Sequence, residues 1–591
     1  MNSSVPESDY RSVSTAALLD PREGDIEDDA TSPGQRSLLA MAGSLLVEIS
    51  LPKLLFAGTI SVLVPALLLG LAPLLASVWL RTVSEHVLAI TEISAVLVLI
   101  VIVALGWFGW HPVFRMVEAS FWALNAIAVQ PGYAFSREAL RHAVELIAGK
   151  GGSAARRTRL RAACSLGAGL LVCAFAALIA FVVWPSSRWT GQLDDLAAPH
   201  HLIVPTLANA VVVVCCYLAV ASLVWGLADS GMDQPLDLEA FDAVGSTSCT
   251  WRVAHLSDLH VVGERYGFRI ESGRSGRQGN EQLARTIARL AAIHAADPLD
   301  YIIISGDMTD AGRAAEWAEF LELLQRYPEL AVRSVILPGN HDLNIVDRAN
   351  PARLDLPFSP GKRLRQMRCL SAMKMLQGAR ACVLGSNGLV MGTLNEVLAP
   401  HRRQIQAFGD RGGLRRGAEL RGIFDDLFPM LLFPVQEDGL GVAILNSNAD
   451  THFSFTNALG LVSARQARRL ESAMARYPKT RWIVALHHHL IEYPMPAASF
   501  SERIGTALVN GSWVVRRLQA FADRAIVMHG HRHIDWIGCC GPLRIISAPS
   551  PVMTPGGDGT SYFYIHHLAT GADGQLRLLA PEHVEVAGEL P

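Results

Sequence analysis

The feature that most constrains this chain is a set of four long stretches that contain no Asp, Glu, Lys or Arg. They run from Leu54 to Leu80, from Ile93 to Phe114, from Ala162 to Ser187 and from Leu202 to Ala228. A helix needs about 20 apolar residues to cross the hydrocarbon core of a bilayer. A buried helix of a soluble core is usually shorter and keeps a polar face. We therefore expect a membrane domain over residues 54–228 with four transmembrane helices.

The composition agrees with a membrane domain. Of 591 residues, 50% are hydrophobic and only 18% are charged, whereas soluble domains carry about 25% charged residues. The net charge of −3 creates no basic field, so no specific binding of nucleic acid is expected. The nine cysteines contain no CxxC pair, which argues against a disulfide framework or a zinc knuckle and favours a reducing compartment.

The distribution of Lys and Arg predicts the orientation in the membrane. The loop after the second stretch carries eight of these residues, and the loops after the first and third carry only Arg81 and Arg188. Because cationic loops stay on the cytoplasmic side, both termini should lie there. Only five of the 51 basic residues are Lys, a bias typical of a GC-rich bacterial genome. We therefore expect a multi-pass protein of a bacterial inner membrane. The stretches contain no Asp, Glu, Lys or Arg, which disfavours a transporter.

The remaining segments differ in composition. Residues 1–53 form an acidic tail rich in Ser, Pro and Gly, for which we expect disorder. Residues 229–249 are typical of a linker, and residues 250–580 are long enough for one large globular domain. Residues 581–591 would form a C-terminal tail.

Five short apolar runs in the globular part each stop at residues that bind metals. The runs begin at Trp251, Tyr301, Val335, Trp482 and Ala525 and are typical of buried strands. The residues that follow them are Asp258 and His260, Asp307, the Asn340-His341-Asp342 triplet, His487 to His489, and His531 and His533. Ligands bind outside the carboxyl ends of strands in α/β sheets. The five runs therefore predict one convergent site.

The spacing of these residues adds detail. Asp258 and His260, like His531 and His533, are two residues apart, which would place each pair on one face of a strand. Asp310 follows Asp307 by three residues and is equally compatible with a site or with a turn and helix N-cap. Helical patterns lie between the strands, and they include Leu283, Ile287 and Leu290, then Trp317, Phe320, Leu321 and Leu324, then residues 461–477. This alternation predicts an α/β sheet with helices on its faces.

Taken together, these motifs resemble the signature of the calcineurin-like metallophosphoesterases. The matching segments are Asp258-x-His260, Gly306-Asp307-x-x-Asp310, Gly339-Asn340-His341-Asp342, the triple His at 487–489 and Gly530-His531-x-His533. The strings HLSDLH, SGDMTD, LPGNHD and LHHH are similar to the bacterial cyclic-nucleotide phosphodiesterase-like branch. The resemblance covers roughly residues 251–576. It implies a four-layer αββα sandwich with a dinuclear metal centre.

The resemblance also implies roles for single residues. Asp258, His260 and His533 would bind the first metal, Asn340, His487 and His531 would bind the second, and Asp307 would bridge both. The metals would be two divalent or mixed-valence ions of Mn, Fe or Zn. A metal-activated hydroxide would attack phosphorus in line.

The catalytic residues implied by the resemblance are His341 and Asp342. His341, held by Asp342, would contact the phosphate or protonate the leaving group. Leu490 and Ile491 stand where this family frequently has Pro, so His487 and His488 both stay open as the ligand of that motif. His255 and His529 lie outside the motif positions, and we expect supporting roles for them.

The long interval between Asn340 and His487 predicts an inserted cap at about residues 351–439. The insert is rich in cations, which are Lys362, Arg363, Arg365, Arg368, Arg402, Arg403, Arg411, Arg415 and Arg416. They could grip a phosphorylated substrate, lie on anionic lipid headgroups, or form an ordinary solvated face.

The leading hypothesis is a membrane-anchored, cytoplasm-facing phosphohydrolase of the phosphodiesterase type, acting on a phosphoester substrate. One alternative is a hydrolase of a lipid-linked phosphoester or diphosphate at the membrane surface. Another is a non-catalytic receptor or scaffold, which is disfavoured because every ligand position is present. The sequence sets no oligomeric state.

Overall fold

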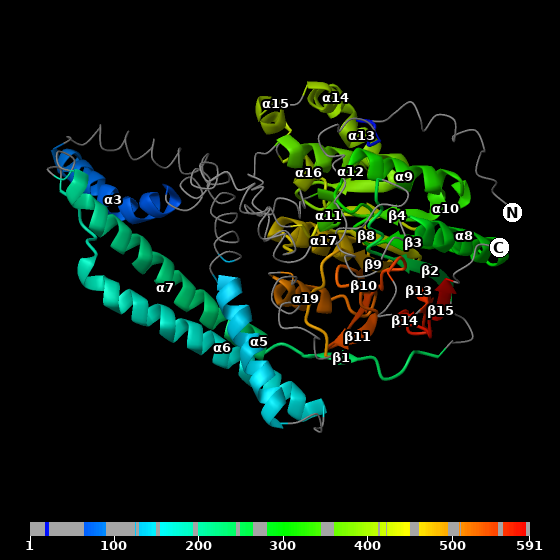
Figure 1. Ribbon diagram of the computed structural model, residues 1–591, viewed down its shortest axis with the longest axis horizontal. Coiled ribbons are helices and arrows are strands. Elements are labelled where there is room, and N and C mark those ends of the chain that lie inside the picture. Colours follow the sequence, from blue (N-terminus) through cyan, green and yellow to red (C-terminus); the bar gives the residue numbers. More distant parts are fainter. Residues whose placement is uncertain are drawn as a thin grey trace, which may run out of the picture. The chain divides into compact units, whose positions relative to one another are not determined.

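The computed structural model divides the chain into two compact units, a helical unit of residues 50–234 and an α/β unit of residues 1–49 and 235–591 (Figure 1). The structure describes residues 18–22, 64–89, 125, 129–148, 154–192, 195, 199–243, 249–263, 280–343, 360–411, 414–420, 422–448, 460–494, 508, 510–553 and 560–586. Each unit is considered separately below.

The helical unit contains two helices that are long and apolar enough to cross a membrane, by length and composition only. They span Thr158–Ser186 and His200–Ser230, and a shorter apolar helix spans Ala66–Arg81. The described helices are α3 (Val64–Ala89), α5 (Gln130–Ala148), α6 (Ala154–Val183) and α7 (Ile203–Ser230), with short 3-10 turns η4 (Trp184–Ser186) and η6 (Pro199–Leu202).

The four expected membrane stretches have different outcomes. The third and fourth, residues 162–187 and 202–228, coincide with the two long helices. The first overlaps α3, whose apolar part is shorter. The second, residues 93–114, lies outside the described residues. Two long apolar helices are therefore established in the described chain, and four spans are not.

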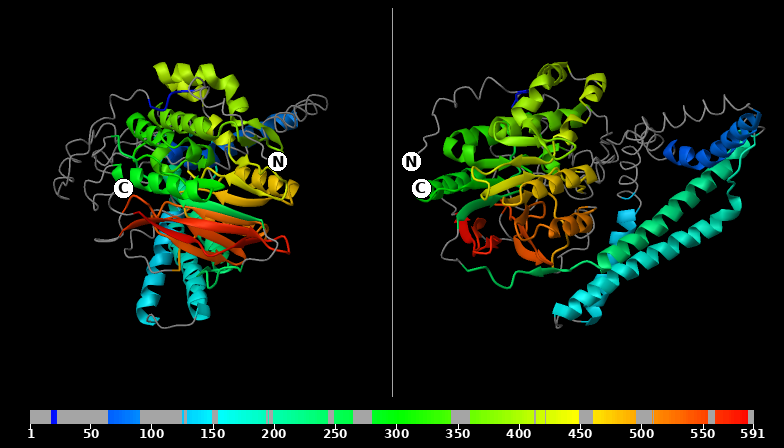
Figure 2. Two further views of the ribbon diagram at one scale, coloured as in Figure 1. Left: turned by 90° about the vertical axis from the view of Figure 1, so that its right-hand side faces the viewer. Right: turned by 180° about the vertical axis from the view of Figure 1, so that it is seen from behind.

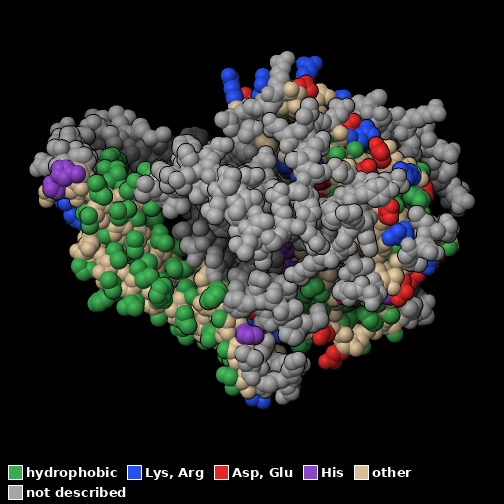
Figure 3. Space-filling model, in the orientation of Figure 1, with side chains coloured by type: hydrophobic (Ala, Val, Ile, Leu, Met, Phe, Trp, Pro, Cys, Tyr) green, Lys and Arg blue, Asp and Glu red, His purple; other side chains and the backbone are tan. Residues whose placement is uncertain are grey.

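Helices α6 and α7 pack closely because small residues face each other. A Cβ atom added to Gly169 would lie 2.7 Å from the carbonyl oxygen of Ser222, and one added to Gly226 would lie 3.0 Å from that of Ser165. The outer faces carry exposed apolar side chains such as Phe181, and Figure 3 shows hydrophobic side chains gathered over both helices. Contiguous exposed apolar surface of this kind marks a membrane or partner contact.

The α/β unit is built on two sheets. The first has nine strands in the order β1-β11-β12-β10-β9-β8-β7-β5-β6, and the second has six, in the order β14-β13-β2-β3-β4 with β15 paired to β13. The bounds are β1 (Pro235–Asp237), β2 (Thr250–Leu256), β3 (Tyr301–Ile304), β4 (Ser334–Ile336), β5 (Ala381–Leu384), β6 (Val390–Thr393), β7 (Met430–Leu432), β8 (Leu440–Ile444), β9 (Arg481–Ala485), β10 (Ala525–His529), β11 (Trp536–Cys540), β12 (Leu543–Ser547), β13 (Ser561–Thr570), β14 (Leu576–Leu578) and β15 (Glu582–Val586).

Helices cover the outer faces of the sheets (Figure 2). Helices α8, α10 and α12 contact strands of the six-stranded sheet, and α19 contacts β12 of the nine-stranded sheet. The bounds are α8 (Glu281–Ala296), α9 (Ala314–Gln325), α10 (Pro328–Arg333), α11 (Asn340–Leu343), α12 (Pro360–Gln377), α13 (Leu394–Leu398), η7 (Ala399–His401), α14 (Arg402–Arg411), α15 (Leu414–Glu419), α16 (Ile423–Asp426), α17 (Ala464–Arg476) and α19 (Gly511–Gln519).

The core lies between the two sheets. Ile303 on β3 and Ile483 on β9 belong to one cluster of buried apolar side chains, and the hydroxyl of Tyr301 donates to the carbonyl of Leu440 on β8 across the gap at 3.0 Å. The αββα sandwich expected from the sequence is therefore confirmed. The five expected strands and the three expected helices are also confirmed, the helices as α8, α9 and α17. The apolar residues of α8 and α9 belong to the same core cluster, and α17 buries its own apolar face.

Three segments expected to be peripheral belong to the α/β unit instead. Leu18, in the tail expected to be disordered, is 1% exposed within the core cluster, and the Leu19 amide donates to Ser371 on α12 at 3.3 Å. Within the expected linker, β1 pairs with β11. Within the expected C-terminal tail, β15 pairs with β13. Composition misjudged these segments because their contacts are with residues distant in sequence.

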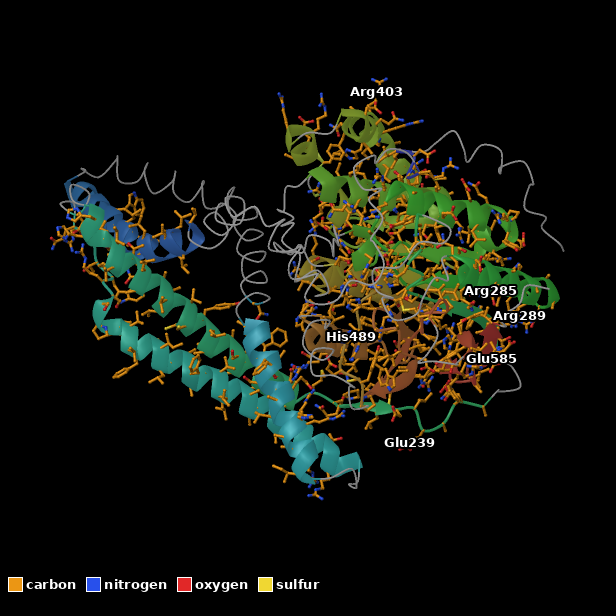
Figure 4. All side chains as sticks on the ribbon, viewed as in Figure 1. Glu239, Arg285, Arg289, Arg403, His489 and Glu585 are labelled. Carbon is orange, nitrogen blue, oxygen red and sulfur yellow. The ribbon has the colours of Figure 1, made fainter. Side chains whose placement is uncertain are left out.

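The insert at about residues 351–439 is not a separate cap. Its strands β5, β6 and β7 extend the nine-stranded sheet beyond β8. Its cations divide into two sets, because Lys362, Arg365 and Arg368 on α12 are buried, whereas Arg403 lies exposed on α14 (Figure 4). A solvated face therefore describes α14 but not α12.

Replacing Leu18 by Ala should destabilise the α/β unit by about 2–5 kcal/mol, because the change removes buried methyl groups and leaves a cavity. Thermal unfolding of the purified full-length protein measures this loss. The control is Leu389→Ala, whose side chain is 41% exposed and whose loss should cost at most about 0.5 kcal/mol. Equal melting temperatures for both variants would show that residues 18–22 do not dock in solution.

Candidate metal centre

The loops that follow strands of both sheets meet at one place. Strands β2, β3 and β4 are parallel, as are β9 and β10 in the other sheet, so their carboxyl ends gather. The amide of His531 donates to the carboxylate of Asp258 at 2.9 Å, and the amide of Gly530 donates to the carbonyl of His487 at 3.0 Å. The ring of His487 donates through Nδ1 to the carbonyl of Ser305 at 2.8 Å. The His531–Asp258 and His487–Ser305 bonds join the two sheets around the predicted site, and the Gly530–His487 bond joins the loops after β9 and β10 of the nine-stranded sheet.

The backbone at this place is in an unusual conformation. Within the described chain, the non-glycine residues with positive φ are Asp258 (56°), His260 (42°), Asp307 (51°), His531 (77°) and His533 (53°). Asp and His adopt this region more readily than most residues, yet each instance costs about 1–3 kcal/mol and persists only where the surroundings enforce it. All five coincide with predicted metal ligands.

This conformation corrects one expectation from the sequence. Asp258 and His260 do not share a face of a strand, because β2 ends at Leu256, and His531 and His533 lie beyond the end of β10 at His529. All four residues have left-handed backbone conformations, so the pleat of a strand does not set the directions of their side chains.

The predicted ligands form two groups. In the first, Nε2 of His533 lies 3.3 Å from Oδ1 of Asp258 and 3.2 Å from Nε2 of His260. In the second, Nε2 of His487 lies 3.2 Å from Oδ2 of Asp307. That same nitrogen lies 3.1 Å from Nδ1 of His531 and 2.9 Å from Oδ1 of Asn340.

Asp307 lies between the two groups, because its Oδ2 is also 3.9 Å from Nε2 of His260. The ligand atoms of Asp258, His260 and His533, and those of Asp307, His487 and His531, each lie within 4.8 Å of one another. Imidazole and carboxylate donors suit divalent Mn, Fe or Zn. Ring nitrogens about 3 Å apart, such as those of His260 and His533, can share a proton or can both donate their lone pairs to one ion. The residues therefore fit two metal ions.

The pKa values of several predicted ligands favour the protonation states that bind metal. Burial raises the pKa of Asp307, but His487 and other imidazoles outweigh burial and hold that pKa well below its usual value. The pKa of Asp258 is likewise raised by burial and brought below its usual value by His533. Burial lowers the pKa of His531 strongly. The carboxylates are thus ionised and His531 is neutral, as metal ligands must be.

His487 behaves differently from His531. Burial lowers its pKa, but the charges of Asp307 and Asp258 overcome burial and raise it to about 9. His488, the alternative ligand, instead hydrogen-bonds through Nδ1 to the hydroxyl of Ser447 at 2.9 Å. The structure thus brings His487, and not His488, to Asp307 and Asn340.

Asp342 does not hold His341. Its carboxylate accepts the amide and hydroxyl of Thr309 at 2.9 and 2.7 Å and the amide of Gly339 at 2.9 Å. The ring of His341 donates through Nδ1 to the backbone carbonyl of Asp310 at 2.7 Å. Asp342 therefore fixes the loops that carry Asp307 and Asn340, and its expected contact with His341 is wrong. The short helix α11 directs the two neighbouring side chains apart.

Asp310 has a larger part in the site than its sequence position alone indicated. It orients His341 through its carbonyl, and its Oδ1 lies 3.4 Å from Nδ1 of His260. Its side chain therefore contacts a metal-ligand ring, and α9 begins after Arg313, so Asp310 is not its N-cap. The three-residue spacing from Asp307 was the signal in the sequence.

His255 and His529, expected to have supporting roles, are both buried beside the site. His255 contacts the hydroxyl of Ser305 through Nε2 at 3.0 Å, and Ser305 also accepts from His487. The ring of His529 donates through Nδ1 to the carbonyl of Gly530 at 3.2 Å, and burial lowers its pKa to about 3.

The sequence did not point to Glu316, which supports the loop that follows Asp310. Its Oε2 accepts the amides of Ala311 and Arg313 at 2.8 and 3.0 Å. Burial, and then the charge of Asp310, raise its pKa to about 7.

Glu316 should therefore make stability depend on pH. Because its folded-state pKa lies above the ordinary value of 4.5, the folded state holds the proton more tightly, and stability falls as pH rises from about 4.5 to 7. Glu316→Gln should then be more stable than wild type at pH 8, by up to about 3 kcal/mol, and similar at pH 5. Melting temperatures across this range test it. A difference that stays constant with pH, or that Glu322→Gln on the exposed side of α9 reproduces, would contradict the assignment.

Comparison with known proteins gives one family match. Residues 252–393 match the family model of the calcineurin-like phosphoesterases. A curated protein of Coxiella burnetii (strain RSA 493 / Nine Mile phase I), named "Probable cyclic nucleotide phosphodiesterase", is 31% identical over 110 residues. The aligned part is 18% of this chain and 38% of that protein, so the chain spans less than half the length of the curated relative it matches.

Two solved structures are similar over the same region. A dimetal phosphatase from Danio rerio is 12% identical, with 57% of this chain and 99% of that chain covered and a TM-score of 0.33. A purple acid phosphatase from yellow lupin (Lupinus luteus) seeds is 12% identical, with 57% and 52% covered and a TM-score of 0.29. Residues 252–393 therefore match a calcineurin-like phosphoesterase domain, and the His and Asp groups of the structure could hold metal ions, which together support a metal-dependent phosphoester hydrolase.

Proposed function

We propose that this protein is a membrane-anchored, cytoplasm-facing dinuclear-metal phosphohydrolase of the phosphodiesterase type. The observation that carries the proposal is the convergence of two buried His and Asp groups on Asp307, within a matched phosphoesterase domain. The name of the curated relative supports a phosphodiester over a monoester.

The geometry supports an assignment of ligands to each ion. Asp258, His260 and His533 would hold the first ion. The second would be held by Asn340, His487 and His531, with Asp307 between the two. Bound divalent ions would supply a nucleophile at neutral pH and neutralise charge on the phosphoryl group.

The chain's own residues would orient the substrate and handle a proton. With Nδ1 of His341 donating to the carbonyl of Asp310, its Nε2 is the atom that exchanges a proton with the leaving group. The ring of His341 lies edge-on to that of His260, with centroids 4.6 Å apart, which supports a role for it beside the proposed first ion. Asp342 would act by fixing the loops around Asp307, without touching the substrate.

A substrate panel on the full-length protein in detergent tests the activity. The Mn²⁺-loaded protein should hydrolyse phosphodiesters, chelator should abolish the activity, and Asp307→Asn should lower both metal content and rate because it removes the bridging charge. The exposed Asp438→Asn is the matched control. Wild-type protein that binds metal yet hydrolyses no phosphoester would contradict the proposal and favour a non-catalytic receptor or scaffold.

The same panel distinguishes the substrate classes. Cyclic nucleotides should be hydrolysed equally well with or without lipid present. If a lipid-linked phosphoester or diphosphate is the preferred substrate, the simpler phosphodiesterase proposal is overturned. The long apolar helices would then serve to give the site access to a substrate in the membrane. Comparing rates in detergent and in lipid nanodiscs separates the two.

The membrane anchor and its orientation rest on the two long apolar helices and on the cationic loop before them. Cys249 is exposed, and Cys216→Ala removes the other exposed cysteine. A membrane-impermeant maleimide should then label Cys249 in inverted vesicles but not in intact cells. Gln192→Cys, between α6 and α7, should show the opposite pattern. Labelling of both from the same side would refute this topology.

A further inference from the structure

Two neighbouring loops of the candidate metal centre are joined by an ion pair that no metal-ligand motif includes. The loop after β9 carries His487 and, five residues later, Glu492. The loop after β10 carries His531 and His533 with Arg532 between them. Nη1 of Arg532 donates to Oε2 of Glu492 at 3.0 Å.

The surroundings of this pair hold both partners in place. The guanidinium of Arg532 lies over the ring of Tyr493, 5.3 Å from its centroid, and Oε1 of Glu492 is 3.4 Å from Nε2 of His489. The side chains of Arg532 and Glu492 are 7% and 15% exposed, so the pair is screened little by solvent. Figure 4 labels His489 on the same loop.

The backbone explains why such a restraint is needed. His531 and His533 both have positive φ, at 77° and 53°, so Arg532 connects two residues in an unfavourable conformation. Such conformations persist only when tertiary contacts enforce them. On the far side of the loop, the hydroxyl of Ser547 donates to the carbonyl of Ile534 at 2.7 Å.

The pair therefore connects ligands of both proposed ions. His487 and His531 belong to the second group, and His533 belongs to the first. A shift of Arg532 would move His531 and His533 together, because it is bonded to both through the main chain. Partners of metal-ligating residues set metal affinity in this way, and their loss typically costs about 10- to 100-fold.

We propose that the Glu492–Arg532 ion pair holds the loops after β9 and β10 together and thereby sets the affinity of the site for divalent metal. This ion pair is called the clasp below. The inference rests on the proposed metal-binding role of His487, His531 and His533. Arg532 and Glu492 are positioning residues, and neither is placed in contact with substrate.

The test is a Mn²⁺ titration of the metal-free full-length protein in detergent, followed by calorimetry and without substrate. Arg532→Met and Glu492→Gln should each weaken Mn²⁺ binding by about 10- to 100-fold. The double variant should be no weaker than the worse single variant, because both changes remove one interaction. Arg532→Lys, which keeps the charge, should restore part of the affinity.

The chain offers a matched control. Arg517 on α19 pairs with Glu471 at 2.6 Å and lies over the ring of Trp513 at 4.6 Å, which reproduces the chemistry of the clasp away from the metal ligands. Arg517→Met should leave Mn²⁺ affinity within about twofold of wild type.

The outcomes separate this inference from the proposed function. Unchanged Mn²⁺ affinity in folded Arg532→Met and Glu492→Gln would overturn the clasp, whatever the activity. If the wild-type protein binds Mn²⁺ normally but hydrolyses no phosphoester, the proposed function is overturned. The Mn²⁺ titration of the variants then still decides whether the ion pair sets metal affinity. If Arg532→Met does not fold, as judged by its melting transition, Glu492→Gln, which keeps the side-chain shape, decides the question.

Discussion

The structure of the α/β unit depends on burying ionised carboxylates against imidazole rings between two sheets. Asp258 and Asp307 are almost fully buried, and a buried charge is tolerated only when it is paired. The carboxylates follow strands of the six-stranded sheet, whereas His487, His531 and His533 follow strands of the nine-stranded sheet. Among the neighbouring groups that lower the pKa of Asp307 and Asp258, the largest contributions come from the other sheet, from His487 and His533 respectively. The sandwich therefore brings together two halves of one electrostatic arrangement, which a metal pair would complete.

Much of this arrangement could be predicted from the sequence, because its signals are local. Each strand is an apolar run in the sequence, and the polar residue that follows the strand is its neighbour in the chain. The convergence of Asp258, Asp307 and His487 could therefore be predicted from the order of the strands. The side-chain directions could not be predicted. The period-two rule assumes an extended backbone, but Asp258 and His260 lie in left-handed turns. Contacts from both sheets hold these turns, because the amides of Asp258 and His260 donate to the carbonyls of Gly306 and Asp307 and the amide of His531 donates to the Asp258 carboxylate.

The remaining differences arise from long-range contacts. The acidic tail looks soluble by composition, but Leu18 and Leu19 dock on residues more than 300 positions away. Arg365 looks like a surface cation, yet its Nε donates to the carbonyl of Ala311 at 2.8 Å beside the metal centre. The family resemblance implies that Asp342 holds His341, yet the carboxylate of Asp342 binds Thr309 instead. In each case the sequence shows the type of residue, but it does not show which distant residue the fold brings into contact with it.

The left-handed backbone at five predicted ligand positions affects which amino-acid substitutions would stabilise this protein. At such positions glycine is the residue that the main chain prefers, so His533→Gly would relieve local strain while it removed a predicted metal ligand. Stability and metal binding thus compete for the same residues, as is common at functional sites. Selection for heat resistance alone would favour glycine at these positions, whereas selection for a metal-binding function would keep Asp and His there despite the backbone strain.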